Sequence, residues 1–240
     1  MAAASTTLPL DGRVALVTGG SRGIGREVSS HLAALGARVV VNYASNPAKA
    51  EELVAERGVS DPAAVLALFD RAEEAFGSPP HIVVAYAGIM DAKYPALADT
   101  AVEDFDATFA VNTRGKLLVC REAARRIPPN SGGRIVTFSS STVAVLPPGY
   151  AASNAAVEAM TRILAKEVAA KGITANVVAP GPVNTELFFA GKDEAFLERV
   201  KKTIGRIAET TQIAPVVTFL ASEASSWVNG QVIRVNGGVA

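Results

Sequence analysis

Residues 18–25 read Thr-Gly-Gly-Ser-Arg-Gly-Ile-Gly, and this stretch decides the fold of the chain. It follows an apolar run at Val14–Val17 that is typical of a buried parallel strand, and a helical pattern begins directly after it. Gly19, Gly23 and Gly25 carry no Cβ, so a diphosphate can approach the backbone at the positive N-terminal end of that helix. A glycine cluster is also common in ordinary turns, but the flanking strand and helix favour a dinucleotide site.

The rest of the chain alternates strand and helix in the same way, which predicts a single-domain doubly wound, Rossmann-like parallel sheet. We expect strands at residues 13–17, 37–43, 81–86, 134–138, 173–178 and 231–235. We expect helices at residues 24–35, 47–57, 62–76, 102–126 and 213–221, a further helix just after Tyr150, and a mobile, partly helical flap over residues 184–205.

One strand of the expected sheet is missing. After the helix at residues 47–57, Gly58–Ser60 leads straight to Asp61 and Pro62, a plausible cap and first-turn proline for the next helix. Too few residues remain for a strand and its turns. Either the sheet lacks one edge strand, leaving the second strand at the edge, or the chain is shortened relative to its relatives.

Length, composition and charge limit the classes of function that the chain can have. The chain has 240 residues, 49% of them hydrophobic, enough for one α/β domain over residues 1–240, with residues 1–10 as a flexible N-terminus. The 23 basic and 23 acidic residues balance without a basic block, so we expect no nucleic-acid or membrane partner. Cys120 stands alone and the two histidines are far apart, so we expect neither a disulfide nor a metal site.

The N-terminal residues lack the basic region and apolar stretch of a signal peptide. No apolar run reaches the about 18 residues that a membrane-spanning helix needs. We therefore expect a cytoplasmic protein, with a plastid-type leader as the alternative that stays open.

The end of the second strand bears on the choice of cofactor. A protein selective for NAD usually places Asp or Glu there to hold the ribose 2′-hydroxyl, but this chain has Asn42, Tyr43, Ala44 and Ser45. No carboxylate repels a 2′-phosphate, and Arg22 in the glycine turn can pair with one, so the sequence predicts NADP(H). The alternative for Arg22 is a solvated loop charge.

With these pieces in order, the chain resembles the short-chain dehydrogenase/reductase family over essentially its whole length. Residues 18–25 look like the family's cofactor turn, residues 85–88 like its Asn-Asn-Ala-Gly segment with both asparagines replaced, and residues 180–185 like the segment that holds the nicotinamide. The resemblance implies a catalytic set of Asn112, Ser140, Tyr150 and Asn154, and a cofactor set of Gly19, Ser21, Arg22, Gly23, Ile24, Gly25, Asn42, Tyr43, Ala44, Ser45, Ala87, Gly88, Pro180, Gly181, Val183 and Thr185. It further implies an NADPH-dependent reductase of small aldehydes or ketones that forms a homodimer or homotetramer.

The chain departs from the family at the proton donor. Tyrosine would protonate the oxyanion that hydride transfer creates, and a phenol of pKa about 10 needs a neighbouring ammonium to work near neutral pH. The family's Tyr-x-x-x-Lys pair becomes Tyr150 and Asn154 here. Lys166 lies twelve residues further along the helix, roughly 18 Å away, so it cannot replace the missing lysine.

Two further departures leave alternatives open. Ser140 and Tyr150 are ten positions apart, a shorter spacing than is usual in the family, so Tyr150 is either the proton donor or merely a loop residue. Gly58 stands where the family places an acidic residue for adenine. The leading hypothesis is a reductase impaired by Asn154, and the rival is a non-catalytic dinucleotide-binding or oligomerising protein of the same fold. A shortened form of a normal enzyme is the third possibility.

Overall fold

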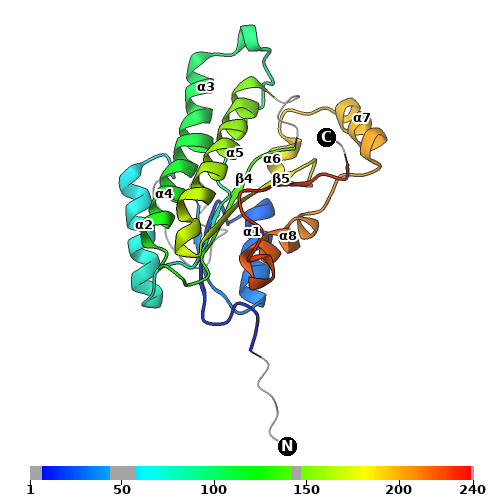
Figure 1. Ribbon diagram of the computed structural model, residues 1–240. Helices are drawn as coiled ribbons and strands as arrows, with labels where there is room; N and C mark the ends of the chain where they lie inside the picture. Colours follow the sequence, from blue (N-terminus) through cyan, green and yellow to red (C-terminus); the bar gives the residue numbers. More distant parts are fainter. Residues whose placement is uncertain (1–6, 44–57, 142–146, 239–240) are drawn as a thin grey trace, which may run out of the picture.

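The computed structural model describes residues 7–43, 58–141 and 147–238. Its centre is a parallel sheet of six strands in the order β2-β1-β3-β4-β5-β6, as the Rossmann-like expectation requires (Figure 1). The strands are β1 (Val14–Thr18), β2 (Arg38–Asn42), β3 (Ile82–Ala85), β4 (Arg134–Phe138), β5 (Thr174–Pro180) and β6 (Val232–Val235).

Helices cover both faces of the sheet because its central strands are apolar on both sides. One face packs against α1 (Gly23–Ala34) and α8 (Ala214–Ala221), and the opposite face against α2 (Pro62–Phe76), α4 (Lys116–Arg126) and α5 (Pro148–Val168) (Figure 1). Each layer encloses its own cluster of buried apolar side chains, so the sheet is held from both sides.

The described part of the sheet agrees with the first of the two alternatives, in which one edge strand is lacking and the second strand lies at the edge. Among the described residues no strand lies beyond β2, which is therefore the edge strand. The Asp61 side chain accepts a 2.9 Å hydrogen bond from the amide of Ala63, and Pro62 begins α2, as the sequence predicts. The helix predicted at residues 47–57 lies outside the described residues.

The long helix predicted over residues 102–126 is wrong in its centre. It consists of α3 (Val102–Phe109), a π-helical segment at Ala110–Gly115, and α4. An apolar pattern does not distinguish a short π-helical segment from regular helix, and such segments are often found at functional sites. This one contains Asn112.

The loop interpretation of Tyr150 is also wrong, because α5 begins at Pro148 and contains Tyr150 in its first turn. Strand β5 continues through Pro180, two residues beyond the predicted end. The predicted flap contains α6 (Glu186–Phe189) and α7 (Glu194–Ile204). Short 3₁₀ turns occur at Leu97–Asp99, Ala169–Lys171, Thr210–Gln212 and Glu223–Ser225.

Candidate active site

The glycine turn lies where the strand order reverses, at the carboxyl ends of β1 and β3. Gly19 has a φ of 71°, and a Cβ there would lie 3.0 Å from the Cα of Ala87. A Cβ on Gly25 would lie 2.3 Å from the carbonyl oxygen of Gly19. Side chains at these positions would close the cradle at the N-terminus of α1, so the residues present fit a dinucleotide diphosphate.

A cavity opens beside this turn, and we call it the cofactor cavity. It adjoins the edge strand through Asn42, which is buried, and Tyr43. The predicted cofactor residues that line it are Gly19, Ser21, Arg22, Gly23, Asn42, Tyr43, Ala87, Gly88 and Thr185. Two others, Ala44 and Ser45, lie outside the described residues.

Arg22 is an exposed charge that forms an ion pair. It is the residue that precedes α1, and its guanidinium lies 3.1 Å from the carboxylate of Glu186, at the start of α6. Both side chains are more than half exposed, so this ion pair is weak, on the order of 1 kcal/mol or less. Glu186 also lines the cofactor cavity, which places the pair at its border.

A second cavity, the reaction cavity, adjoins the first and shares Tyr86, Gly88, Thr185 and Leu187 with it. All four predicted catalytic residues line it: Asn112, Ser140, Tyr150 and Asn154. The remaining predicted cofactor residues that line it are Ile24, Pro180, Gly181 and Val183, while Gly25 lies behind the cradle and lines neither cavity. The residues predicted from the sequence therefore come together from α1, the segment after β4, the end of β5, α5 and the π-helical segment.

Asn112 is fully engaged by its neighbours. Its Oδ1 accepts from the amide of Ile89 at 2.8 Å, and its Nδ2 donates to the carbonyl oxygen of Ile89 at 2.8 Å and to Ser153 Oγ at 3.1 Å. The Ser153 hydroxyl in turn donates to the carbonyl oxygen of Tyr150 at 2.8 Å. Asn112 thus connects the loop after β3 to the first turn of α5, where Tyr150 lies.

Tyr150 and Ser140 reach the same cavity despite their short separation in the sequence. Ser140 lies two residues after the end of β4 and is buried. Burial raises the pKa of Tyr150, and hydrogen bonding to the Asn154 side chain opposes part of that rise. The Asn154 amide also donates to the carbonyl oxygen of Tyr150 at 3.0 Å, so this uncharged side chain turns back along its own helix.

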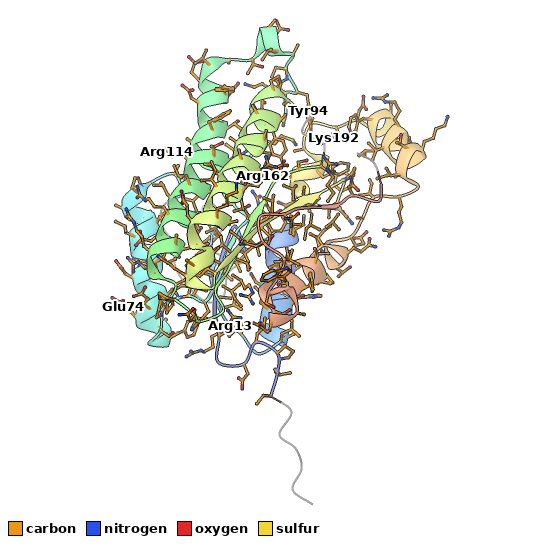
Figure 2. All side chains as sticks on the ribbon, in the orientation of Figure 1. Arg13, Glu74, Tyr94, Arg114, Arg162 and Lys192 are labelled. Carbon is orange, nitrogen blue, oxygen red and sulfur yellow. The ribbon has the colours of Figure 1, made fainter. Side chains whose placement is uncertain are left out.

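Two lysines in the reaction cavity were not predicted from the sequence. Lys116 is buried at the start of α4, four residues after Asn112 and therefore on the same side of the helix, a spacing that could have revealed it. Lys192 lies between α6 and α7, where its Nζ contacts the Tyr94 hydroxyl and the carbonyl oxygen of Phe188. Figure 2 labels Tyr94 and Lys192 close to each other, and no local pattern in the sequence predicts their contact.

Burial lowers the pKa of Lys192 to about 8 and raises the pKa of Tyr94 to about 12. The Lys192 ammonium also lies against three aromatic rings, those of Tyr94, Phe188 and Phe196. This side of the reaction cavity, which we call the outer wall, is formed by Leu187, Phe188, Lys192, Phe196 and Arg199 and is therefore apolar and cationic.

In the parts of the chain that the structure describes, no helix is both long and apolar enough to cross a membrane. Within those same parts, the His, Cys, Asp and Glu side chains form no cluster that could hold a metal ion.

The fold and its two cavities define a dinucleotide-binding protein of the doubly wound class. Comparison with known proteins identifies its family. The family described as Enoyl-(Acyl carrier protein) reductase matches residues 19–240. A protein of Arabidopsis thaliana named NADPH-dependent aldehyde reductase-like protein, chloroplastic, is 50% identical over 96% of this chain and 95% of its own length.

A Short-chain type dehydrogenase/reductase of Picea abies is also 50% identical, over 95% of this chain and 93% of that protein. Among solved structures, a short-chain dehydrogenase of Burkholderia cenocepacia in complex with NADP aligns with a TM-score of 0.87 at 34% identity, covering 96% of this chain and 99% of that one. The chain belongs to the short-chain dehydrogenase/reductase family, as its motifs predict.

Proposed function

We propose that this protein transfers a hydride from NADPH to the carbonyl carbon of a small aldehyde or ketone, with Tyr150 as the proton donor. The observation that carries the proposal is the meeting of Tyr150 and Ser140 in one cavity that is continuous with the glycine-turn cavity. Substrate and cofactor can therefore lie against each other, as direct hydride transfer requires.

NADPH is the cofactor that the chain and its relatives favour. One relative is named NADPH-dependent, and a solved neighbour holds NADP. Asn42 and Tyr43 offer no carboxylate against a 2′-phosphate, and the weak pair between Arg22 and Glu186 leaves the guanidinium free to exchange its partner for a phosphate. The backbone of the glycine turn holds the diphosphate.

The bound nucleotide supplies the hydride. Tyr150 then donates its phenolic proton to the oxygen of the substrate carbonyl, and the Ser140 hydroxyl donates a hydrogen bond to the same oxygen as negative charge develops there. Asn112 has a different part. Because its amide is engaged by Ile89 and Ser153, it positions the first turn of α5 rather than contacting substrate.

The outer wall of the reaction cavity suits a carbonyl compound that has an apolar part, and it tolerates an anionic substituent. Leu187, Phe188 and Phe196 supply apolar surface, while Lys192 and Arg199 supply positive charge. No acidic side chain lines the reaction cavity within the described residues, so an anionic substituent meets no like charge there.

The test measures NADPH binding and turnover on the same samples. Tyr150→Phe is expected to bind NADPH normally, by fluorescence titration, and to lose about 10²-fold or more of kcat with a reactive aldehyde. Ser140→Ala is expected to lose a comparable factor, and Ser141→Ala is the matched control because Ser141 does not line the cavity. NADPH binding without turnover in the parent protein would support the rival, a non-catalytic dinucleotide-binding protein.

Assembly and location complete the proposal. Exposed Leu117 and Ile163 on α4 and α5 support a homodimer or homotetramer, which light scattering coupled to gel filtration would test. For location, the relative named chloroplastic favours the plastid alternative over the cytoplasm. Cell fractionation with an antibody decides between the two.

A further inference from the structure

Lys116 is a buried cation in the wall of the reaction cavity. The residue is only 4% exposed, and its ammonium donates to the carbonyl oxygen of Phe138, the last residue of β4, at 2.9 Å. Among the described residues no carboxylate lies within ion-pair distance of it, although Glu158 and Glu167 belong to the neighbouring helix α5. Within the described residues, the ammonium therefore has a hydrogen bond to the backbone and no ion pair.

Such a lysine destabilises the fold. Burial of an ammonium without a carboxylate partner is unfavourable, and here it lowers the pKa of Lys116 to about 8. Methionine would fill a similar volume without this penalty. A buried charge without a partner breaks a general rule of folding. Such exceptions are expected at functional sites, where the residue is selected for its chemistry and not for packing.

The position of Lys116 suggests which chemistry. It borders the same cavity as Tyr150 and Asn154, approaching from α4 while they approach from α5. Asn154 occupies the helical position where an ammonium would face the tyrosine, but its amide carries no charge and bonds the carbonyl oxygen of Tyr150. Within the described residues, the other cations of this cavity, Lys192 and Arg199, belong to the outer wall.

We propose that Lys116 is the positioning residue that supplies, from α4, the positive charge that Asn154 cannot supply, so that Tyr150 releases its proton more readily. The proposal rests on the function proposed above. The charge stabilises the phenolate that remains after proton transfer, and thus lowers the barrier to that transfer. Cys120 on the same helix is the titratable group that interacts with Lys116, and Tyr86, Tyr150 and Lys192 line the same cavity. On α5, Glu158 accepts from Ser139 Oγ at 2.7 Å.

The test moves the charge from one helix to the other. Lys116→Met is compared with Lys116→Met/Asn154→Lys, and Lys171→Met is the matched control, because Lys171 also donates to a backbone carbonyl at 2.9 Å but lies outside the reaction cavity. The full-length protein is assayed with NADPH and aldehyde. Independently of turnover, phenolate absorbance is titrated with pH, and subtraction of the Tyr150→Phe titration isolates Tyr150 among only four tyrosines.

The proposal expects three results. Lys116→Met loses about tenfold or more of kcat with little change in KM, the apparent pKa of Tyr150 rises, and lysine at position 154 restores both. An unchanged kcat and Tyr150 titration in Lys116→Met overturns the proposal. So does a fall in kcat without a shift of the titration and without rescue, because that pattern is loss of packing. A parent protein that lacks turnover contradicts the proposed function, while its Tyr150 titration still decides whether Lys116 acts on the phenol.

Discussion

Gly25→Ala tests whether the crowded glycine turn shapes the cofactor site. The added Cβ would lie 2.3 Å from the carbonyl oxygen of Gly19 and 2.7 Å from Cδ1 of Tyr86. Neither contact is easily relieved. The first atom belongs to the backbone of the turn, and the Tyr86 ring already packs edge-to-face on Phe138, with centroids 4.9 Å apart. The turn must therefore move away from the N-terminus of α1.

The size of the effect follows from these contacts. Overfilling of a well-packed site costs about 1–3 kcal/mol, and we expect the free energy of unfolding of Gly25→Ala to fall by that amount. The displaced turn also presents its amides less well to the diphosphate. We expect the dissociation constant for NADPH to rise about tenfold or more, which corresponds to about 1.4 kcal/mol.

Two assays measure these effects, equilibrium urea denaturation and NADPH fluorescence titration. Gly58→Ala is the matched control, because Gly58 also lines the cofactor cavity but its Cβ would meet, among the described residues, nothing closer than Ser60 Oγ at 3.8 Å. The reasoning is refuted if Gly25→Ala unfolds at the same urea concentration as the parent protein and binds NADPH equally well. A loss of stability without loss of affinity would show that the turn adapts around the ligand.

Three other predictions follow from individual side chains. Asn42→Asp places a carboxylate at the cofactor cavity and is expected to weaken NADPH binding about tenfold relative to NADH binding. Both nucleotides are titrated, and an equal loss of affinity for the two would contradict the prediction. Lys192→Met removes the contact with Tyr94 and is expected to raise KM several-fold for an anionic aldehyde. Because the Lys192 ammonium titrates near pH 8, the KM difference from the parent should shrink above that pH, and a constant difference would refute the electrostatic explanation. Lys116→Met is expected to resist urea better at pH 7. Since the pKa of Lys116 falls from 10.5 to about 8 on folding, the parent sheds the charge and gains stability as pH rises from about 8 to 10.5, so the advantage of the variant should decline over that interval.

Local signals in the sequence were sufficient for much of this fold. Strand β4 has the predicted bounds, Arg134–Phe138, because glycines precede it and serines follow it. Asp61 caps α2 as predicted, because a cap is made within a few residues of chain. The edge position of β2 was one of two alternatives left open by the sequence, because only residues 58–60 separate the helix predicted at residues 47–57 from the cap of α2.

The features that were missed depend on contacts between distant segments. The π-helical segment around Asn112 shares the apolar pattern of the regular helix on either side, so periodicity could not reveal it. The contact between Tyr94 and Lys192 joins residues 98 positions apart. Lys116 is a partial exception, because its spacing from Asn112 indicates its side of the helix, whereas the burial of its ammonium depends on the contact with Phe138 of β4.

In this site the position of Tyr150 is maintained despite the short Ser140 to Tyr150 spacing, whereas the charge that should accompany it is missing. Pro148 begins α5 at once, so Tyr150 falls in the first turn of the helix, and the chain of bonds from Asn112 through Ser153 to the Tyr150 carbonyl holds that turn in place. The position of Tyr150 is therefore compatible with a short connection, because the start of a helix and a few hydrogen bonds are enough to define it. A missing charge has no such remedy: hydrogen bonds from Asn154 do not replace an ammonium, so a working proton donor needs a cation from another element.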